Sequence, residues 1–531
     1  MSYRGRFCNY APMAKGLFDS LNSIDIDPTY TTDTRNSRFG PNYVRKRNGM
    51  TVIGGVVKAA TRFTGGFQYR NPSGAIRDCV TMADGKFYAL IGSTWTDRTG
   101  VVVLSTATDN RVHMTAFNGL VVGTDNVNPL FVWDGNTANS ILTAAGIWDT
   151  SKWDTGRWGT AVPQRVRLLQ NFGDRLIALD FTASDGTARP DGFAWSGLNN
   201  PSSWDTTVNG FLRIQQAGGN PIYGAGQSGD RMIVLFEDAL YEVAQTGNDL
   251  MPYQASLLAY GVGTRAPYAV ISHGNDVYFL TENGPERLSM VLADKIGEFS
   301  EPIRQFWSTV DYSQSLTFSG AYSDGEKALK WGVRLSAGTE NTRTIVYRVD
   351  TGAWSIDDNY VADVMWPYRN SSSKKTTACG STDRAFELDR GTTDLVPATG
   401  AASNIPWYIW TPWLDCHEAE SGPKHIKLWQ DFQCQYLQQT GNTMDIGYQL
   451  ALFPDLRVTT SIVLLNYNNA GIWDQGMWDI AVWGGANEDQ AQTSIPLEGD
   501  STHIRFKFVN NAAVQVTLEG FEISFFDTRS V

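Results

Sequence analysis

A short motif recurs along the first three quarters of the chain: a Gly, Asp or Asn turn followed at once by an apolar strand. Its copies lie at 83–90, 117–122, 172–179, 228–235 and 273–280, and weaker copies occur at 324–325 and near Asp383. Successive turn glycines are 34 to 56 residues apart, close to the ~40 to 50 residues of a four-stranded propeller blade. The spacing predicts a β-propeller of six or seven blades over residues 51–400.

The strands that follow these turns are apolar at consecutive positions, as in 232–236. Such strands require cover on both faces, which stacked sheets provide. One helix is predicted among them, with Ser300 at the N-cap and Glu301 and Pro302 in the first turn. Its apolar stripe at helical spacing consists of Ile303, Phe306, Trp307 and Val310. We expect the helix to pack this stripe and to carry no chemistry.

From about residue 401 the hydrophobic pattern changes to alternation. One parity carries Ile426, Leu428, Phe432, Cys434 and Tyr436, and residues 503–508 alternate in the same way. Residues 514–525 continue the alternation, with a shift at Gly520. Strands with one solvent-exposed face and one buried face predict an antiparallel β-sandwich over residues 401–531.

The composition supports an all-β protein of more than one unit. The chain has 531 residues, 51 of them glycine, and 12% of its residues are aromatic, which suits ring-rich strands joined by glycine turns. Its formal net charge of −12 argues against a basic surface that grips nucleic-acid phosphates, although not against DNA that merely passes by. No segment resembles a signal peptide or a membrane span, so we expect a soluble chain made in a cytoplasm.

The titratable residues offer little catalytic chemistry. The cysteines Cys8, Cys79, Cys379, Cys416 and Cys434 form no CxxC motif, and we expect free thiols. His417 and His425 lie near Cys416 and Cys434, but His425 and Cys434 differ in parity and would point to opposite faces of a strand. We therefore predict no metal site and no cofactor. The sequence also contains no nucleophile motif, and we predict that the chain is not an enzyme.

One motif keeps a different function class open. Residues 349–355 faintly resemble the end of a sialidase Asp-box, and propellers can host glycosidases. The competing interpretation is that Asp350, Gly352 and Trp354 close a turn and place the indole between two blades. The alternative function is therefore a propeller that binds or cleaves host-surface glycans.

Two tryptophan arrays share one spacing. The first consists of Trp148, Asp149, Trp153, Asp154 and Trp158, and the second of Trp473, Asp474, Trp478, Asp479 and Trp483. Steps of five residues turn successive indoles to opposite faces of a strand, or about 140° apart on a helix. We therefore predict compact turns in which the aspartates cap backbone N–H groups. The indoles are candidates for internal packing, for sugar stacking or for anchoring a partner.

Four further stretches carry a family resemblance. They are 16–49, with Asn36, Arg38-Phe39-Gly40 and 45–49; 193–204, with Trp195-Ser196-Gly197, Pro201 and Trp204; 283–288, leading to the helix after Ser300; and 410–415, with Lys424 and Lys427. Together these stretches resemble the tail-tube nozzle proteins of short-tailed phages (podoviruses), a group that includes the packaged-DNA stabilisation proteins. Residues 1–50 are similar to the extended N-terminal arm of that family.

The resemblance implies a structural virion protein. Its subunits would form a homohexameric ring that extends the tail channel, helps to retain packaged DNA and conducts it during ejection. The implied partners are tail adaptor or hub proteins, tail fibres or tip proteins, and genomic DNA that passes through the lumen without specific binding, with no membrane insertion. The implied location is the virion tail, after assembly in the host cytoplasm. The acidic charge fits this role, because an acidic wall would repel phosphates and let DNA slide.

Overall fold

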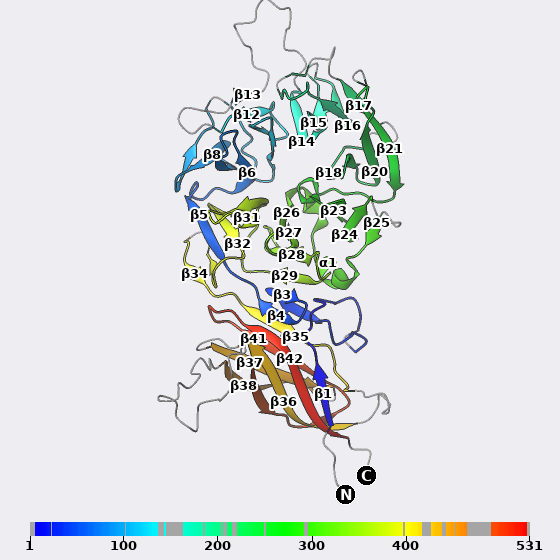
Figure 1. The fold of residues 1–531 in the computed structure, drawn as a ribbon, viewed down its shortest axis with the longest axis vertical. Helices are drawn as coiled ribbons and strands as arrows, with labels where there is room; N and C mark the ends of the chain where they lie inside the picture. Colours follow the sequence, from blue (N-terminus) through cyan, green and yellow to red (C-terminus); the bar gives the residue numbers. More distant parts are fainter. Residues whose placement is uncertain are drawn as a thin grey trace, which may run out of the picture.

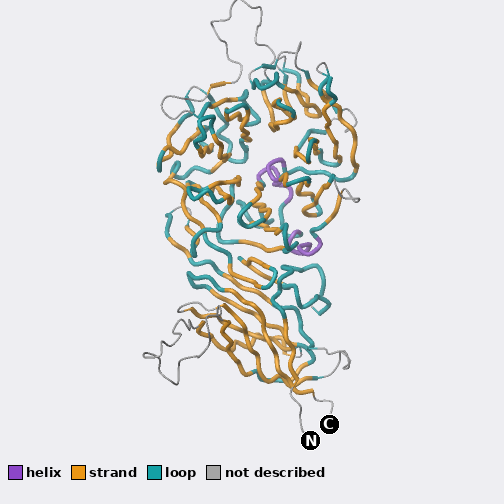
Figure 2. Tube along the Cα trace, viewed as in Figure 1, coloured by secondary structure: helices purple, strands orange, loops and turns teal. Residues whose placement is uncertain are grey.

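The computed structural model describes residues 6–22, 24–100, 102–135, 143–144, 163–183, 186–201, 203–204, 210–214, 220–248, 251–290, 296–396, 399–416, 426–437, 442–451, 453–464 and 490–527. The protein is all-β, and helical turns are short and few among these residues. Many small antiparallel sheets occupy one part of the molecule, and two larger sheets occupy the other (Figures 1 and 2). We call these parts the seven-sheet region and the two-sheet region.

The seven-sheet region contains seven four-stranded antiparallel sheets in chain order. The first three consist of β6 (Phe63–Arg70), β7 (Ile76–Met82), β8 (Lys86–Ile91) and β9 (Thr94–Asp97); β10 (His113–Phe117), β11 (Leu120–Thr124), β12 (Phe131–Trp133) and β13 (Thr143–Ala144); and β14 (Arg165–Phe172), β15 (Arg175–Thr182), β16 (Ala188–Trp195) and β17 (Phe211–Arg213). The next two consist of β18 (Gly224–Ser228), β19 (Arg231–Leu235), β20 (Ala239–Gln245) and β21 (Tyr253–Tyr260); and β22 (Ile271–His273), β23 (Asp276–Thr281), β24 (Gly284–Ser289) and β25 (Ile296–Glu298).

The last two sheets connect the end of this region to its beginning. The sixth consists of β26 (Ser319–Ser323), β27 (Ala328–Val333), β28 (Arg343–Arg348) and β29 (Trp354–Asp357). The seventh consists of β30 (Val364–Arg369), β31 (Lys375–Ser381) and β32 (Arg384–Leu388), and its fourth strand is β5 (Met50–Val56). Because β5 precedes the first sheet in the chain, the seventh sheet is built from both ends of the region.

Apolar cores lie between successive sheets. One cluster of buried side chains joins each sheet to the next, and another joins the seventh sheet to the first, through residues such as Phe63 and Trp366. The first strands β6, β10, β14, β18, β22, β26 and β30 also contact one another in this order, and β30 contacts β6. The sheets are therefore arranged around a common centre (Figure 1).

The prediction of strands buried on both faces is confirmed. All residues from Met232 to Phe236 have relative exposures of 0%. Met232 and Val234 pack toward the third sheet, whereas Ile233 and Leu235 pack toward the fifth. The continuous apolar run thus reflects burial between two neighbouring sheets.

The turn glycines mark the hairpins with one exception. Gly119, Gly173, Gly229 and Gly274 have positive φ and join the first strand of a sheet to the second. Gly85 instead joins β7 to β8, the second and third strands of the first sheet. Gly74, with φ 85°, occupies the equivalent turn between β6 and β7. The short first spacing in the sequence therefore arose from comparing two different hairpins.

The two-sheet region combines strands from both ends of the chain. Its seven-stranded sheet contains β3 (Ser37–Gly40), β4 (Tyr43–Lys46), β42 (Thr517–Asp527), β36 (Lys427–Leu437) and β39 (Gln490–Pro496), with β1 (Arg6–Tyr10) on β42 and β40 (Asp500–Ser501) on β36. Its five-stranded sheet contains β2 (Asp33–Arg35), β35 (Trp407–Trp410), β41 (Ile504–Asn510), β37 (Asn442–Leu450) and β38 (Phe453–Leu464). A small pair, β33 (Asp394–Leu395) and β34 (Ala402–Ser403), lies between the regions in sequence.

The two larger sheets face each other across one core. The Phe432 ring on β36 stacks on the Phe506 ring on β41 with 4.3 Å between centroids. The predicted alternation of residues 503–508 is confirmed, since Ile504, Phe506 and Phe508 are buried in this core. The shift at Gly520 is also confirmed, because the register between β36 and β42 slips there.

One parity prediction is wrong at its start. Ile426 and Leu428 are about 40% exposed, whereas Lys427 and Trp429 are buried. The register between β36 and β42 shifts between Trp429 and Asp431. A bulge at this point inserts one residue, and one inserted residue exchanges the two faces of a strand. Phe432, Cys434 and Tyr436 lie after the bulge and point into the core as predicted.

The stretch expected as an extended N-terminal arm instead contributes four short strands to the two larger sheets. β1, β3 and β4 add to the seven-stranded sheet, and β2 pairs with β35 of the other sheet. A free segment would leave these backbone groups without sheet partners, and pairing with the C-terminal strands satisfies them. The two-sheet region therefore requires both ends of the chain.

The predicted helix is present but shorter than expected. Residues Glu301–Ile303 form a 3₁₀ turn, η3, and α1 covers Arg304–Trp307. Ser300 makes no side-chain cap, contrary to the prediction. The Asp19 carboxylate instead accepts the N–H groups of Gln305 and Phe306 at 2.9 and 2.7 Å. Asp19, from the N-terminal part of the chain, thus caps the helix in place of Ser300. No helix in the described part of the chain is long and apolar enough to cross a membrane.

Candidate functional site

A network of buried charges lies where the two regions meet. Arg38 on β3 is 2% exposed, and its guanidinium donates to both oxygens of Asp357 at 2.7 Å. It also donates to Asp389 at 2.9 Å. Asp357 ends β29 of the sixth sheet, and Asp389 follows β32 of the seventh. A single arginine of the two-sheet region therefore holds carboxylates from two neighbouring sheets of the other region.

A second arginine extends the network. Arg47, directly after β4, donates to Asp394 on β33 at 2.8 Å and to the carbonyl of Asp358 at 2.9 Å. Its Nε donates to the side-chain oxygen of Asn36 at 2.8 Å. Asn36 adopts φ 58° and donates to both Asp358 and Pro406 at 2.6 Å. The left-handed turn at Asn36 therefore places its amide between the arginine and the backbone around Asp358.

The network is balanced in charge. Lys330 on β27 pairs with Asp389, and Glu326 pairs with Arg38 and Arg45 at 3.4 Å. Burial alone would lower the pKa of Arg38, but Asp357 and Asp389 hold it well above its usual value. Burial would raise the pKa of Asp389, but Lys330 and Arg38 hold it far below its usual value. Arg38 and Asp389 therefore remain charged around neutral pH, and the network holds the two regions together.

One buried cation beside the network, Lys46, forms no ion pair with a carboxylate in the described part of the chain. Lys46 donates to the side-chain oxygen of Asn510 at 3.0 Å and to the Ala512 carbonyl at 2.6 Å. Burial and the neighbouring Arg47 lower its pKa to about 8. Lys46 thus fixes the loop after β41 to β4, on the two-sheet side of the junction.

A second polar cluster spans the common centre of the seven sheets. Arg111 precedes β10 and is 2% exposed. Its guanidinium donates to the carbonyl of Phe63 at 2.9 Å and to that of Thr317 at 3.2 Å. The Tyr268 hydroxyl donates to the Arg111 carbonyl at 3.0 Å. Phe63 begins the first strand of the first sheet, whereas Tyr268 and Thr317 precede the first strands of the fifth and sixth sheets. Arg111 itself precedes the second sheet, which is not a neighbour of the fifth or the sixth. The arginine therefore bridges the centre.

The histidine at this centre is bonded to the backbone of a neighbouring sheet. His113 on β10 is partly buried, and its Nδ1 accepts the N–H of Leu169 at 3.3 Å. Burial lowers its pKa to about 4. A neutral imidazole that accepts a backbone hydrogen bond is fixed in one tautomer, which suits a structural role.

Buried tryptophans lie in one stretch that carries the family resemblance, 193–204, and in the stretch that resembles an Asp-box, 349–355. Trp195 and Trp204 are each 5% exposed, and the buried Ser196 hydroxyl accepts the N–H of Leu176. Trp354, of the stretch that resembles an Asp-box, is 1% exposed and stacks on Phe299 and Trp331. The turn before it uses Gly352 at φ 72°. These observations favour the turn interpretation of residues 349–355.

The remaining sequence candidates are placed only in part. Cys416 and Cys434 are buried in the core of the two-sheet region, and His417 and His425 lie outside the described residues. Within the described ranges no group of His, Cys, Asp and Glu could hold a metal ion. Both tryptophan arrays lie outside the described residues, so all ten of their candidates remain predictions: Trp148, Asp149, Trp153, Asp154, Trp158, Trp473, Asp474, Trp478, Asp479 and Trp483.

A shallow pocket lies between the third and fourth sheets. It is lined by Phe172, Gln227, Asp230, Arg231 and Gln245, among others. Asp230 pairs with Arg231 at 3.3 Å. The lining includes one carboxylate, whereas glycoside hydrolysis ordinarily uses two across the sugar.

Comparisons with known proteins leave the family open. No family model and no curated protein matches the chain. Among solved structures, the computationally designed Ika8 protein matches 64% of this chain and 99% of its own, at 11% identity and a TM-score of 0.37. The extracellular domain of a hybrid two-component system from B. thetaiotaomicron matches 68% of this chain at 11% identity and a TM-score of 0.39. The match spans 44% of that second protein.

Proposed function

We propose that the chain is a structural subunit of a phage tail nozzle. In this proposal the seven-sheet region is a seven-bladed β-propeller closed by β5, and the two-sheet region is a β-sandwich that includes the N-terminal strands. The circuit of contacts among first strands and the core between the seventh and first sheets support the propeller. The shared core around Phe432 and Phe506 supports the sandwich.

One observation carries the functional part of the proposal. Asn36, Arg38 and Arg47 belong to one of the four stretches that resemble the nozzle family, and they form the buried junction between the two regions. Residues that resemble the family and that connect two regions are expected in a structural subunit, whereas an enzyme would be expected to place such residues at a catalytic site. Another resembling stretch, 193–204, also supplies the packing residues Trp195 and Trp204.

The proposed path of DNA lies between subunits. Arg111 and its partners cross the centre of the seven sheets, so a duplex would not thread through one subunit. A ring of copies, six by the family resemblance, would enclose the channel instead. The acidic chain would repel phosphates along such a wall.

Electron microscopy and mass measurement test the proposal. Antibodies against the protein should label the tail tip of virions, and purified or self-assembled material should contain closed rings. Material that contains only dimers, or labelling away from the tail, would contradict it. Cleavage of host capsule or lipopolysaccharide that is lost on changing one carboxylate would favour the glycan alternative.

A further inference from the structure

The outer face of the five-stranded sheet carries a ladder of rings and cations. On β35 and β41, Trp407, Ile409 and Phe506 point into the core, so the intervening residues point away from it. The ladder consists of Tyr408, Lys507, Trp410, Arg505 and Trp413. One carboxylate joins them, since Asp33 lies beside Trp410 on β2 and accepts the Tyr408 hydroxyl at 3.1 Å. The ladder is therefore mainly aromatic and cationic, in a chain that is acidic as a whole.

The two cations are held between the rings. Lys507 Nζ lies 5.2 Å from the centre of the Tyr408 ring and 5.3 Å from that of Trp410. Arg505 Cζ lies 4.7 and 4.6 Å from the ring centres of Trp410 and Trp413. Arg505 also donates to Gln449 at 2.7 Å. Burial lowers the pKa of Arg505 with no opposing carboxylate. The rings hold both cations in place, and neither cation forms an ion pair with a carboxylate of the described residues.

The outer face of the seven-stranded sheet has the opposite character. Asp431 on β36 and Glu519 and Glu522 on β42 alternate with core residues and lie on the side away from the core. Large apolar side chains accompany them: Phe7 is 58% exposed and Leu428 is 40% exposed. Glu522 pairs in register with Asn9 on one side and Gln433 on the other, so no cation sits directly beside it in the sheet.

The geometry of the region places these faces on opposite sides. Because the two sheets share one core, their outer faces point in opposite directions. Two copies related by a twofold axis through the ladder would place cation against cation. Copies set side by side in the same sense would place the ladder of one against the carboxylates of the next. Such a head-to-tail contact is heterologous, and it closes into a ring when the rotation permits.

We propose that the ladder face docks on the acidic face of a second copy of this chain. Lys507 and Arg505 would meet Glu522, while the indoles of Trp410 and Trp413 would cover apolar side chains such as Phe7. Trp and Arg are favoured residues at such contacts. The inference rests on the proposed ring for its closure, but it specifies which surfaces meet.

Charge reversal tests the contact. Lys507→Glu and Glu522→Lys should each weaken self-association about tenfold, because each places like charges opposite one another. An equimolar mixture of the two variants should associate again, since each reversed face meets a complementary face. The double variant carrying both changes should also recover. Recovery separates a lost contact from a misfolded subunit. Sedimentation velocity over a concentration series at low salt measures each dissociation constant.

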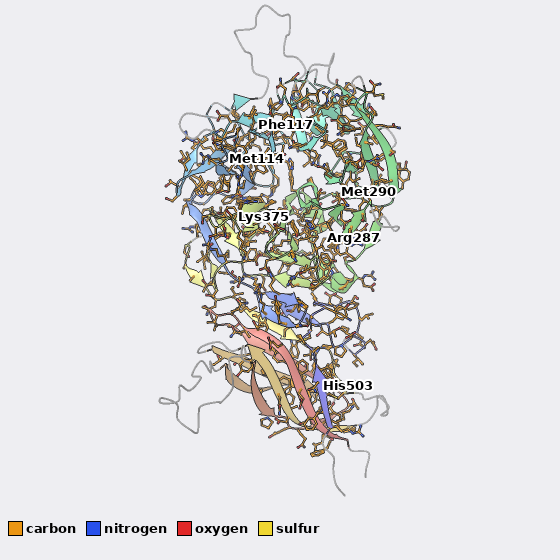
Figure 3. All side chains as sticks on the ribbon, viewed as in Figure 1. Met114, Phe117, Arg287, Met290, Lys375 and His503 are labelled. Atoms are coloured by element: carbon orange, nitrogen blue, oxygen red, sulfur yellow. The ribbon has the colours of Figure 1, made fainter. Side chains whose placement is uncertain are left out.

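Lys375 and Asp324 provide a matched control. They form an exposed pair at 3.1 Å, with side chains 54% and 51% exposed; Lys375 lies in the seven-sheet region, away from the part that holds His503 (Figure 3). Lys375→Glu and Asp324→Lys should leave association unchanged. Rings that form normally from both single variants at the ladder and acidic faces would overturn this inference and leave the nozzle proposal standing. Wild-type protein that never associates would overturn both.

Discussion

The two regions of the molecule differ in the sequence distance between their paired strands. In the seven-sheet region every pairing joins consecutive strands except that of β5 with β32. In the two-sheet region β42, near the end of the chain, pairs with β1 and β4, near its beginning. Local pairing costs little loop-closure entropy, whereas pairing of the chain ends orders a long loop. The first region can form as it is made, and the second must wait for the whole chain.

The junction network makes the two regions depend on each other. Arg38 and Arg47 enter from the two-sheet region, and their main carboxylate partners come from β29, β32 and β33. A region that needs both chain ends thus holds the last sheets of the other region in place. Substitutions that affect one region or the junction should therefore have distinguishable effects on unfolding.

The largest effect is expected at the junction. Arg38→Ala leaves Asp357 and Asp389 buried with fewer cations, and breaking a buried pair in this way costs about 3 to 5 kcal/mol. We expect the unfolding transition to separate into two steps as the regions lose their connection. Urea unfolding followed by circular dichroism and by tryptophan fluorescence measures both the free energy and the number of steps.

Arg35 offers a control for that change. Its side chain is 23% exposed, and its ion pairs with Asp33 and Asp358 are both 3.8 Å long. Arg35→Ala should cost less than about 1 kcal/mol, as for other partly exposed pairs. A similar loss from the two substitutions would contradict the special role given to Arg38.

The tryptophan arrays sharpen the comparison, since one lies in the sequence of each region. If the indoles are packed, Trp153→Ala and Trp478→Ala should each cost about 3 to 5 kcal/mol and lower the melting temperature of the isolated subunit. Trp148 lies at the end of its array, so Trp148→Ala should lower the free energy of unfolding less than Trp153→Ala does. Thermal melts unchanged from wild type, together with failed assembly, would instead identify the arrays as partner anchors.

The same comparison explains what the sequence could predict. Local repeats reveal the seven sheets, because each turn and its strand lie within a short window, as around Gly229 and 232–236. The strands β1 and β2 gave no such signal, because their partners lie hundreds of residues away. The bulge before Asp431 is likewise set by pairing with β42 and not by the local alternation.

The junction illustrates the same limit at the level of single residues. The sequence singled out Asn36, Arg38 and Arg47 through the family resemblance, but it gave no sign of their carboxylate partners. Asp357 and Asp389 look like ordinary turn residues at the ends of strands. Only the arrangement of three sheets in space brings them to one guanidinium. The Asp19 cap was missed for the same reason, since it comes from a distant segment.

A substitution at Asp78 in the first sheet should change stability by a moderate amount, and it should stabilise the protein, whereas the substitutions above destabilise it. Its carboxylate is 9% exposed and accepts a hydrogen bond from Gln68 at 2.7 Å, and burial raises its pKa to about 6. The native state therefore holds a proton between pH 4 and 6 that the unfolded state has released, so stability from this group falls as pH rises through that range. Asp78→Asn should stabilise the protein by about 2 to 3 kcal/mol at pH 7.

The pH profile checks this assignment. Asp78→Asn retains an acceptor for Gln68, and its gain should disappear below about pH 4, where Asp78 is protonated in both states. Asp230, whose side chain is 90% exposed, provides the control, and Asp230→Asn should change stability by less than about 0.5 kcal/mol. A gain that is equal at pH 4 and pH 7 would show that the cause is not desolvation of the charge.

The smallest effect is expected at a turn of the repeat that defines the seven-sheet region. Gly274 joins β22 to β23 with φ 61°, and a Cβ atom at this position would meet no atom within 4 Å. Gly274→Ala should therefore cost about 1 to 2 kcal/mol through backbone conformation alone. Gly274→Asn should cost less, because asparagine tolerates the left-handed region. Gly297, which has equal space and no positive φ, should accept alanine without loss. Equal melting temperatures for Gly274→Ala and Gly297→Ala would show that conformation at the turn does not limit the stability of the repeat.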